Sequence, residues 1–152
     1  WKKKNKLFFN ITISKPIIRE SIYLKLNKKN FVYKSLIFPN KNIYSNKIGN
    51  GCILEPNILV SNDVSLGQGN FVFFGTIIAH NVTVGSFCNI GCNVVISGNT
   101  KIGNKVMIGA NTFISDNLVI CDNTMITPGS VVLKSIKKPG IYQNNLMIKP
   151  LW

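Results

Sequence analysis

Residues 78–109 read IAHNVTVGSFCNIGCNVVISGNTKIGNKVMIG, and within this stretch an aliphatic residue returns at every sixth position. The same spacing extends in both directions, from Ile48 to Val132. All fifteen positions of this column are Ile, Leu or Val: Ile48, Leu54, Val60, Leu66, Val72, Ile78, Val84, Ile90, Ile96, Ile102, Ile108, Ile114, Ile120, Ile126 and Val132. Neither the 3.6-residue period of a helix nor the alternation of a strand sustains a period of six. The column therefore indicates a repeat architecture.

Two further columns keep the same period. Three residues after each aliphatic the chain is rich in Gly and Asn, as at Gly51 and Asn99, and both residue types accept the positive φ of a tight corner. Four residues after it, the side chain is small or β-branched, as at Cys52 and Val82. We predict an all-β fold, a left-handed parallel β-helix whose triangular coil consists of three hexads. Its strands pair with those of the coils above and below.

The chain outside the repeat follows other patterns. Residues 7–13 and 31–37 are typical of strands, and Pro16 opens a predicted helix that ends near Lys28. We expect residues 1–40 to be an incomplete α/β piece of a larger domain, since the chain begins with Trp1 rather than Met. The β-helix is expected over residues 41–133, followed by a C-terminal tail over residues 134–152.

The formal net charge is +13, and much of it lies before residue 50. Such a charge attracts anionic partners such as nucleotides or CoA, although a general richness in Lys, Asn and Ile explains it more simply. No nucleic-acid-binding motif is present, so we expect no nucleic-acid partner. No stretch approaches the roughly 18 uninterrupted apolar residues that a membrane span requires.

The four cysteines predict neither a metal site nor a disulfide. None forms a C-x-x-C pair, which argues against zinc. Cys52 and Cys88 fall in one inward column, two coils apart, and at about 4.8 Å per coil they are too distant for a disulfide. Free buried thiols favour a reducing compartment, and we expect a cytoplasmic protein.

The stretch from Ile78 to Gly85, Ile-Ala-His-Asn-Val-Thr-Val-Gly, resembles the His-acid-x-x-Ile-Gly motif of a family of bacterial hexapeptide sugar acetyltransferases. These are the enzymes related to sialic acid O-acetyltransferase and UDP-bacillosamine N-acetyltransferase, and the resemblance covers about residues 7–142. It implies an acetyl-CoA-dependent enzyme that acetylates the amine or hydroxyl of a sugar or nucleotide sugar. It also implies a homotrimer that holds acetyl-CoA in the groove between neighbouring subunits and needs no metal.

The resemblance assigns His80, the chain's only histidine, as the general base. Imidazole suits this task, because it titrates near neutral pH. The next residue, usually acidic in the family, is Asn81, whose amide can orient the ring but supplies no charge. Asp63 lies one coil earlier in the same column as Asn81 and is a candidate to supply the missing charge, although a purely solvated role is the simpler interpretation.

The resemblance also assigns the cofactor site. Asn89 stands where the family has a second histidine that contacts the thioester carbonyl, and its amide can still donate a hydrogen bond. The CoA-contact positions align with Ala110 and Pro128, and Pro128 has no N–H to donate. The small residues Gly98 and Gly109 are expected to leave the backbone accessible to the pantetheine arm. The CoA phosphates are expected near Lys134, Lys137 and Lys138.

Departures from the family motivate an alternative of a different class. Asn81 and Asn89 replace family residues, and the Gly-rich turn that cradles the nucleotide phosphate is absent. The alternative is a non-catalytic or degenerate β-helix that acts as a trimeric assembly subunit, and CoA binding separates the two hypotheses. A γ-class carbonic anhydrase shares this fold but needs three histidines around one metal. This chain has one histidine, so we set that class aside.

Overall fold

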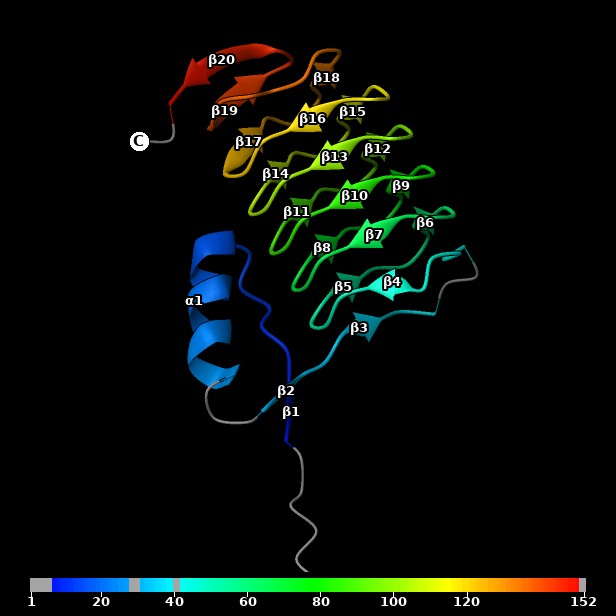
Figure 1. The fold of residues 1–152 in the computed structure, drawn as a ribbon, viewed down its shortest axis with the longest axis vertical. Helices are drawn as coiled ribbons and strands as arrows, with labels where there is room; N and C mark the ends of the chain where they lie inside the picture. Colours follow the sequence, from blue (N-terminus) through cyan, green and yellow to red (C-terminus); the bar gives the residue numbers. More distant parts are fainter. Residues whose placement is uncertain (1–6, 28–30, 40–41, 151–152) are drawn as a thin grey trace, which may run out of the picture.

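The computed structural model describes residues 7–27, 31–39 and 42–150 as a parallel β-solenoid of about six turns with one helix at its side (Figure 1). Two-residue strands recur every six residues along the repeat. They are β4 (Lys47–Ile48), β5 (Ile53–Leu54), β6 (Leu59–Val60), β7 (Ser65–Leu66), β8 (Phe71–Val72), β9 (Ile77–Ile78), β10 (Thr83–Val84), β11 (Asn89–Ile90), β12 (Val95–Ile96), β13 (Lys101–Ile102), β14 (Met107–Ile108), β15 (Phe113–Ile114), β16 (Val119–Ile120), β17 (Thr124–Ile126) and β18 (Val131–Val132).

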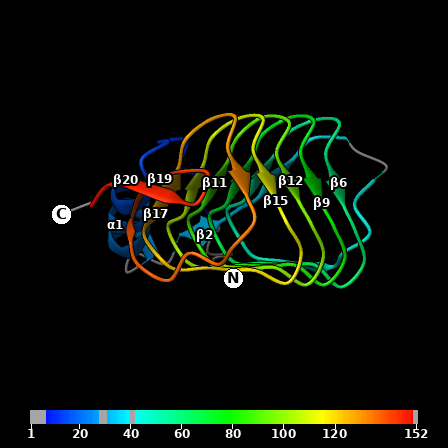
Figure 2. The same cartoon turned by 90° about the horizontal axis from the view of Figure 1, so that it is seen from above.

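Three parallel sheets form the walls of the solenoid, and we name each by a central strand. The β10 sheet has the order β4-β7-β10-β13-β16, and the β12 sheet has the order β6-β9-β12-β15-β18. The β11 sheet begins with β3 (Leu36–Ile37), continues β5-β8-β11-β14-β17, and ends with β19 (Gly140–Gln143) and the antiparallel β20 (Leu146–Lys149). Paired residues within the repeat are 18 apart, as in Thr83↔Lys101 and Ile77↔Val95, so three hexads form one coil (Figure 2). The predicted left-handed parallel β-helix is confirmed.

The interior is built from the two columns that the sequence singled out. The aliphatic column is buried from Leu54 to Val132, and only Ile48, in the first coil, is partly exposed. The column four residues later is buried too, apart from the half-buried Leu118. Its Thr hydroxyls bond backbone carbonyls; Thr76 Oγ1, for example, donates to Gly91 O at 2.7 Å. A polar atom inside the stack therefore keeps a hydrogen-bond partner, as burial requires.

The corners explain the Gly and Asn column. Fourteen positions at six-residue spacing, from Gly51 to Gly129, all have positive φ. Most are Gly, Asn or Asp, but Phe87 and Lys105 adopt the same conformation, so the corner keeps its geometry even where the residue type does not favour it.

The N-terminal residues form a small strand–helix–strand unit beside the solenoid. β1 (Phe8–Phe9) pairs in parallel with β2 (Val32–Tyr33), and α1 (Pro16–Asn27) lies between them in sequence. The helix begins at the predicted Pro16, whereas its predicted end near Lys28 lies outside the described residues. β3 (Leu36–Ile37) then joins the β11 sheet by pairing with β5. Helix α1 runs along the outer side of that sheet (Figure 1).

The C-terminal tail is folded as a β-hairpin. β19 (Gly140–Gln143) pairs in parallel with β17, and β20 (Leu146–Lys149) pairs antiparallel with β19. The partners Thr124 and Gly140 are 16 residues apart rather than 18, so the hexad period ends before this strand. Over the described part of the chain, no helix combines the length and apolar character needed to cross a bilayer.

Candidate active site

His80 lies in the turn between β9 and β10, at the corner where the β12 sheet meets the β10 sheet. Its side chain is exposed, and its Nδ1 lies 2.9 Å from Asn81 Oδ1. Because an amide oxygen only accepts hydrogen bonds, Nδ1 is the donor in this contact, and in the neutral ring the lone pair is then on Nε2. Backbone bonds to both neighbouring coils fix the turn: Asn81 N donates to Asn62 O, and Asn99 N donates to His80 O, each at 3.1 Å.

The imidazole lies directly against Gly98, the corresponding residue of the next coil. A Cβ at Gly98 would lie 2.6 Å from His80 Cε1 and 2.8 Å from Nε2, closer than such atoms approach. The ring itself occupies the space beside this glycine, so a larger side chain at position 98 would displace the imidazole.

The side chain of Asn89 makes contacts other than the expected one with a thioester carbonyl. The residue is 7% exposed on β11. Its Oδ1 accepts a hydrogen bond from Arg19 Nη2 at 2.7 Å, and its Nδ2 donates to Ser14 O. The amide therefore joins the N-terminal segment to the solenoid.

The remaining cofactor candidates gather in one apolar pocket of about 210 Å³ on the β11 side of the solenoid. Gly109, Ala110 and Pro128 line it together with Asn89, and Met107 and Met125 are among its other walls. Gly109 admits no side chain here, because a Cβ would lie 2.3 Å from Pro128 N. Sequence reasoning thus selected four residues of one pocket.

Within one chain the candidate residues form two separate groups. The turn of His80 and Gly98 leaves the β12 sheet, whereas the turn of Ala110 and Pro128 enters it. The two groups therefore lie at opposite edges of the same sheet. The candidate phosphate contacts Lys134, Lys137 and Lys138 follow β18 and are exposed.

Arg19 is the buried charged residue that sequence reasoning missed. Its guanidinium is fully buried and donates to Ile13 O (2.7 Å), Gly69 O (3.0 Å), Phe87 O (3.0 Å), Cys88 O (3.1 Å), Ser14 O (3.2 Å) and Asn89 Oδ1 (2.7 Å). It also lies 4.0 Å from the centroid of the Phe71 ring. Burial lowers the pKa of Arg19 from its usual value. No sequence signal marks this residue, because almost all its acceptors are backbone carbonyls.

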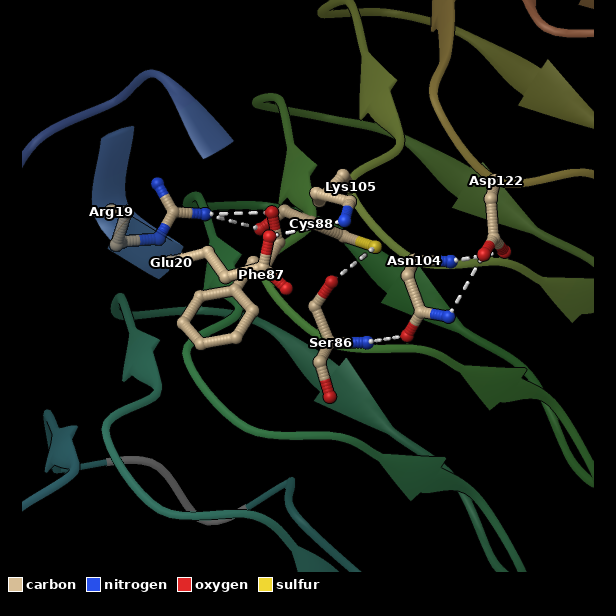
Figure 3. A network of polar contacts seen from close by, with 8 residues as sticks. All are labelled: Arg19, Glu20, Ser86, Phe87, Cys88, Asn104, Lys105 and Asp122. Atoms are coloured by element: carbon tan, nitrogen blue, oxygen red, sulfur yellow. Dashed lines mark hydrogen bonds and ion pairs between the residues drawn. The ribbon is translucent and has the colours of Figure 1, made fainter. Parts of the chain in front are cut away.

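The corner beside Arg19 is reinforced by polar side chains (Figure 3). Glu20 forms an ion pair with Lys105 at 3.0 Å. Asn104 Oδ1 accepts from Ser86 N at 2.8 Å, and Asp122 Oδ1 accepts from Asn104 N at 2.8 Å. The two hydrogen bonds each join one coil to the next, and the ion pair joins α1 to the solenoid, so this network is structural.

Comparison with known proteins identifies the repeat and the fold. Residues 99–134 match the family model described as bacterial transferase hexapeptide (six repeats). The search of curated proteins finds no match. The family model confirms the hexapeptide repeat inferred from the sequence, and the solved structures that follow share its fold.

Three solved structures show the similarity of fold. PerB from Caulobacter crescentus, solved with CoA and GDP-perosamine, has a TM-score of 0.83 at 17% identity, covering 91% of this chain and 69% of that one. The acetyltransferase domain of PglB from Neisseria gonorrhoeae, solved with acetyl coenzyme A, has a TM-score of 0.83 at 22% identity, covering 93% and 69%. WeeI from Acinetobacter baumannii has a TM-score of 0.79 at 19% identity, covering 97% and 73%.

Proposed function

We propose that this chain is an acetyl-CoA-dependent acetyltransferase that acts on the amine or hydroxyl of a sugar or nucleotide sugar, with His80 as general base. The observation that carries the proposal is the way the imidazole ring of His80 is held in position. Nδ1 lies 2.9 Å from Asn81 Oδ1, and the ring lies against Gly98. In the neutral ring this contact leaves the lone pair on Nε2. This arrangement occurs in a fold shared with enzymes solved with CoA.

The chemistry follows from that geometry. As the acceptor nitrogen or oxygen attacks the thioester carbonyl, its proton passes to Nε2 of His80. The tetrahedral intermediate then collapses, the C–S bond breaks, and the departing CoA thiolate takes the proton from the imidazolium. The acetyl group moves to the acceptor, and His80 returns to its neutral form. Asn81 keeps the productive tautomer, but its neutral amide does not strengthen the base as a carboxylate would.

The outer faces of the three sheets favour assembly into a homotrimer. Helix α1 lies along the β11 sheet, and the outward residues of the β10 sheet are largely polar. The outward column of the β12 sheet is entirely apolar: Leu59, Ile77, Val95, Phe113 and Val131. Ile77, Phe113 and Val131 are 41%, 39% and 47% exposed. Such a contiguous apolar column is typical of an interface.

A second copy on this face would complete the site. The His80 turn and the Ala110 turn flank the β12 sheet on opposite edges, so neighbouring copies in a ring bring the base of one subunit beside the apolar pocket of the next. The pantetheine arm would pass Gly109 and Ala110. The phosphates would lie near Lys134, Lys137 and Lys138, and salt would weaken those contacts.

The decisive experiment is a calorimetric titration with acetyl-CoA. Wild-type protein is expected to bind, and Ala110→Trp is expected to weaken binding by at least about tenfold, because the indole fills the pocket. Thr83→Trp, on the exposed outer face of the β10 sheet, is the matched control and should bind like wild type. Absence of heat with millimolar acetyl-CoA would contradict the proposal.

One observation favours the second candidate, a non-catalytic assembly subunit. The Asn89 amide is bonded to both Arg19 and Ser14, so a thioester contact would compete with a structural one. A trimer that forms normally yet fails to bind acetyl-CoA would support this alternative.

A further inference from the structure

A second, polar pocket lies at the same corner as His80. Its volume is about 580 Å³, and it is lined by Ile43, Tyr44, Ser45, Asn46, Lys47, Asn62 and Asp63. One wall is the segment that leads into β4, and the other is the turn after β6. The first wall is fixed by hydrogen bonds: Tyr44 N donates to Val60 O at 2.8 Å, and Ser45 Oγ donates to Val64 O at 2.5 Å.

This pocket adjoins the coil that carries the base. Asn81 N donates to the carbonyl of Asn62, a residue of the pocket wall, at 3.1 Å. Asn62 and Asp63 occupy the positions one coil before His80 and Asn81, and adjacent coils are spaced by about 4.8 Å. A hexose ring resting in the pocket can therefore extend one substituent toward His80.

The side chains of the pocket are suited to an anionic sugar. Among the described residues, the ammonium of Lys47 and the carboxylate of Asp63 have neither a hydrogen-bond partner nor an ion-pair partner. The side chain of Tyr44 is 62% exposed at the pocket edge. An ammonium binds phosphate or carboxylate, a carboxylate accepts hydrogen bonds from sugar hydroxyls, and an aromatic face packs against the apolar face of a pyranose.

We propose that this pocket holds the acceptor sugar, and that the acceptor carries a phosphate or carboxylate group. Lys47 binds the anion, Asp63 binds the ring hydroxyls, and Tyr44 supplies the platform for the ring. The reacting amine or hydroxyl then lies toward His80, which takes its proton in the transfer step given above. The inference rests on the proposed acetyltransferase function and adds to it an acceptor site within the solenoid itself.

The test is ligand-observed NMR binding of sugars to the whole chain in the absence of acetyl-CoA. The probes are glucose 1-phosphate, N-acetylneuraminic acid and the neutral methyl glucoside. At least one anionic probe is expected to bind about tenfold more tightly than the neutral one. The phosphate and carboxylate probes show which anion is preferred, and either preference supports the proposal.

Variants distinguish binding in this pocket from general attraction of anions to the charged surface. Lys47→Gln should remove most of the preference for the anionic probe, and Asp63→Asn should weaken all bound sugars by roughly tenfold. The controls are Lys101→Gln, on the same face of the β10 sheet as Lys47, and Asp116→Asn, at the same corner as His80. Both should bind like wild type.

The two proposals fail in distinguishable ways. If no anionic sugar binds at millimolar concentration, or if Lys47→Gln and Asp63→Asn both bind like wild type, the acceptor pocket is wrong even when acetyl-CoA binds. If a sugar binds as expected but acetyl-CoA does not, the acetyltransferase function is wrong and the sugar site stands.

Discussion

His80 is constrained from three directions although it is exposed. Asn81 holds one ring nitrogen, Gly98 provides the surface against which the ring lies, and backbone bonds fix the turn in both neighbouring coils. A side chain held in this way loses little further entropy when a substrate arrives, which favours proton transfer. The substitutions that test this residue therefore separate its chemistry from the fold.

His80→Ala is expected to lower the acetyl-transfer rate by about 10²–10⁴-fold, the usual contribution of a general base. The fold and the affinity for acetyl-CoA should change little, because the side chain is exposed and its backbone bonds remain. The measurement is an acetyl-transfer assay on 4-amino nucleotide sugars and on sialic acid. An active preparation in which His80→Ala is as fast as wild type would show that His80 is not the base.

Asn81→Asp restores the acidic residue of the family motif and is expected to raise the rate severalfold. A carboxylate beside Nδ1 stabilises the imidazolium that forms in the transition state, whereas an amide only orients the ring. The same assay measures the effect, with Asp116→Asn as a control for charge at this corner. A rate that falls in Asn81→Asp would mean that the amide is itself required.

The buried thiols make stability depend on pH in the alkaline range. Burial raises the pKa of Cys52 to about 11 and that of Cys88 to about 12, from an ordinary value of 9.0. The unfolded chain therefore loses these protons at lower pH than the folded chain does. Their contribution to stability is complete below about pH 9 and is lost as the pH rises toward about 12.

Denaturant unfolding measured at neutral pH and at about pH 10.5 tests this dependence. The free energy of unfolding should fall at the higher pH, and Cys88→Ala should reduce that fall. In the native protein at neutral pH, both thiols should resist alkylation, because the thiolate is the reactive form. Rapid alkylation of Cys88 without unfolding would contradict its burial.

At the scale of elements, Arg19 joins α1 to the solenoid. Arg19→Ala removes hydrogen bonds to five backbone carbonyls and to Asn89, and leaves buried acceptors without donors. We expect the free energy of unfolding to fall by about 3 kcal/mol. Lys25→Ala, exposed on the same helix, is the control and should change it little. Urea denaturation is the measurement, and equal stability of the two variants would contradict this role.

The elements of the repeat were predictable because each hexad carries its own signal. The aliphatic residue gives the strand and its inward face, and the Gly or Asn gives the corner. The β19–β20 hairpin was not predicted, since its 16-residue offset from β17 breaks the period on which the prediction rested. The docking of α1 was not predicted either, because Arg19 binds carbonyls of residues 50 to 69 positions away in sequence.

At the scale of the whole molecule, the apolar outer face of the β12 sheet predicts the assembly. Phe113→Lys places a charge in the middle of that face and is expected to convert a trimer to monomers. Thr83→Lys, exposed on the β10 sheet, adds the same charge elsewhere and should leave the trimer intact. Light scattering gives the masses. A monomeric wild-type protein at micromolar concentration would overturn the trimer and the groove between subunits.

Sequence reasoning named candidate residues for the site but did not predict how they are arranged. The motif register selected His80, and the same register selected Ala110 and Pro128, which line one pocket. The number of hexads between two residues fixes the corner of the coil at which each lies. This number places the two groups at opposite edges of the β12 sheet. The polar pocket near His80 depends on how residues 43–47 cross the first coil, and no repeat specifies that path.

The 18-residue coil limits how the length of such a chain can change. Deleting six residues would keep every aliphatic side chain inward, yet it would shift each later strand to the next wall and mix polar with apolar residues on every outer face. Deleting eighteen would preserve both interior and exterior. The core thus tolerates insertions and deletions in units of one hexad, whereas the surface that carries the corner sites and the apolar face tolerates them only in units of a whole coil.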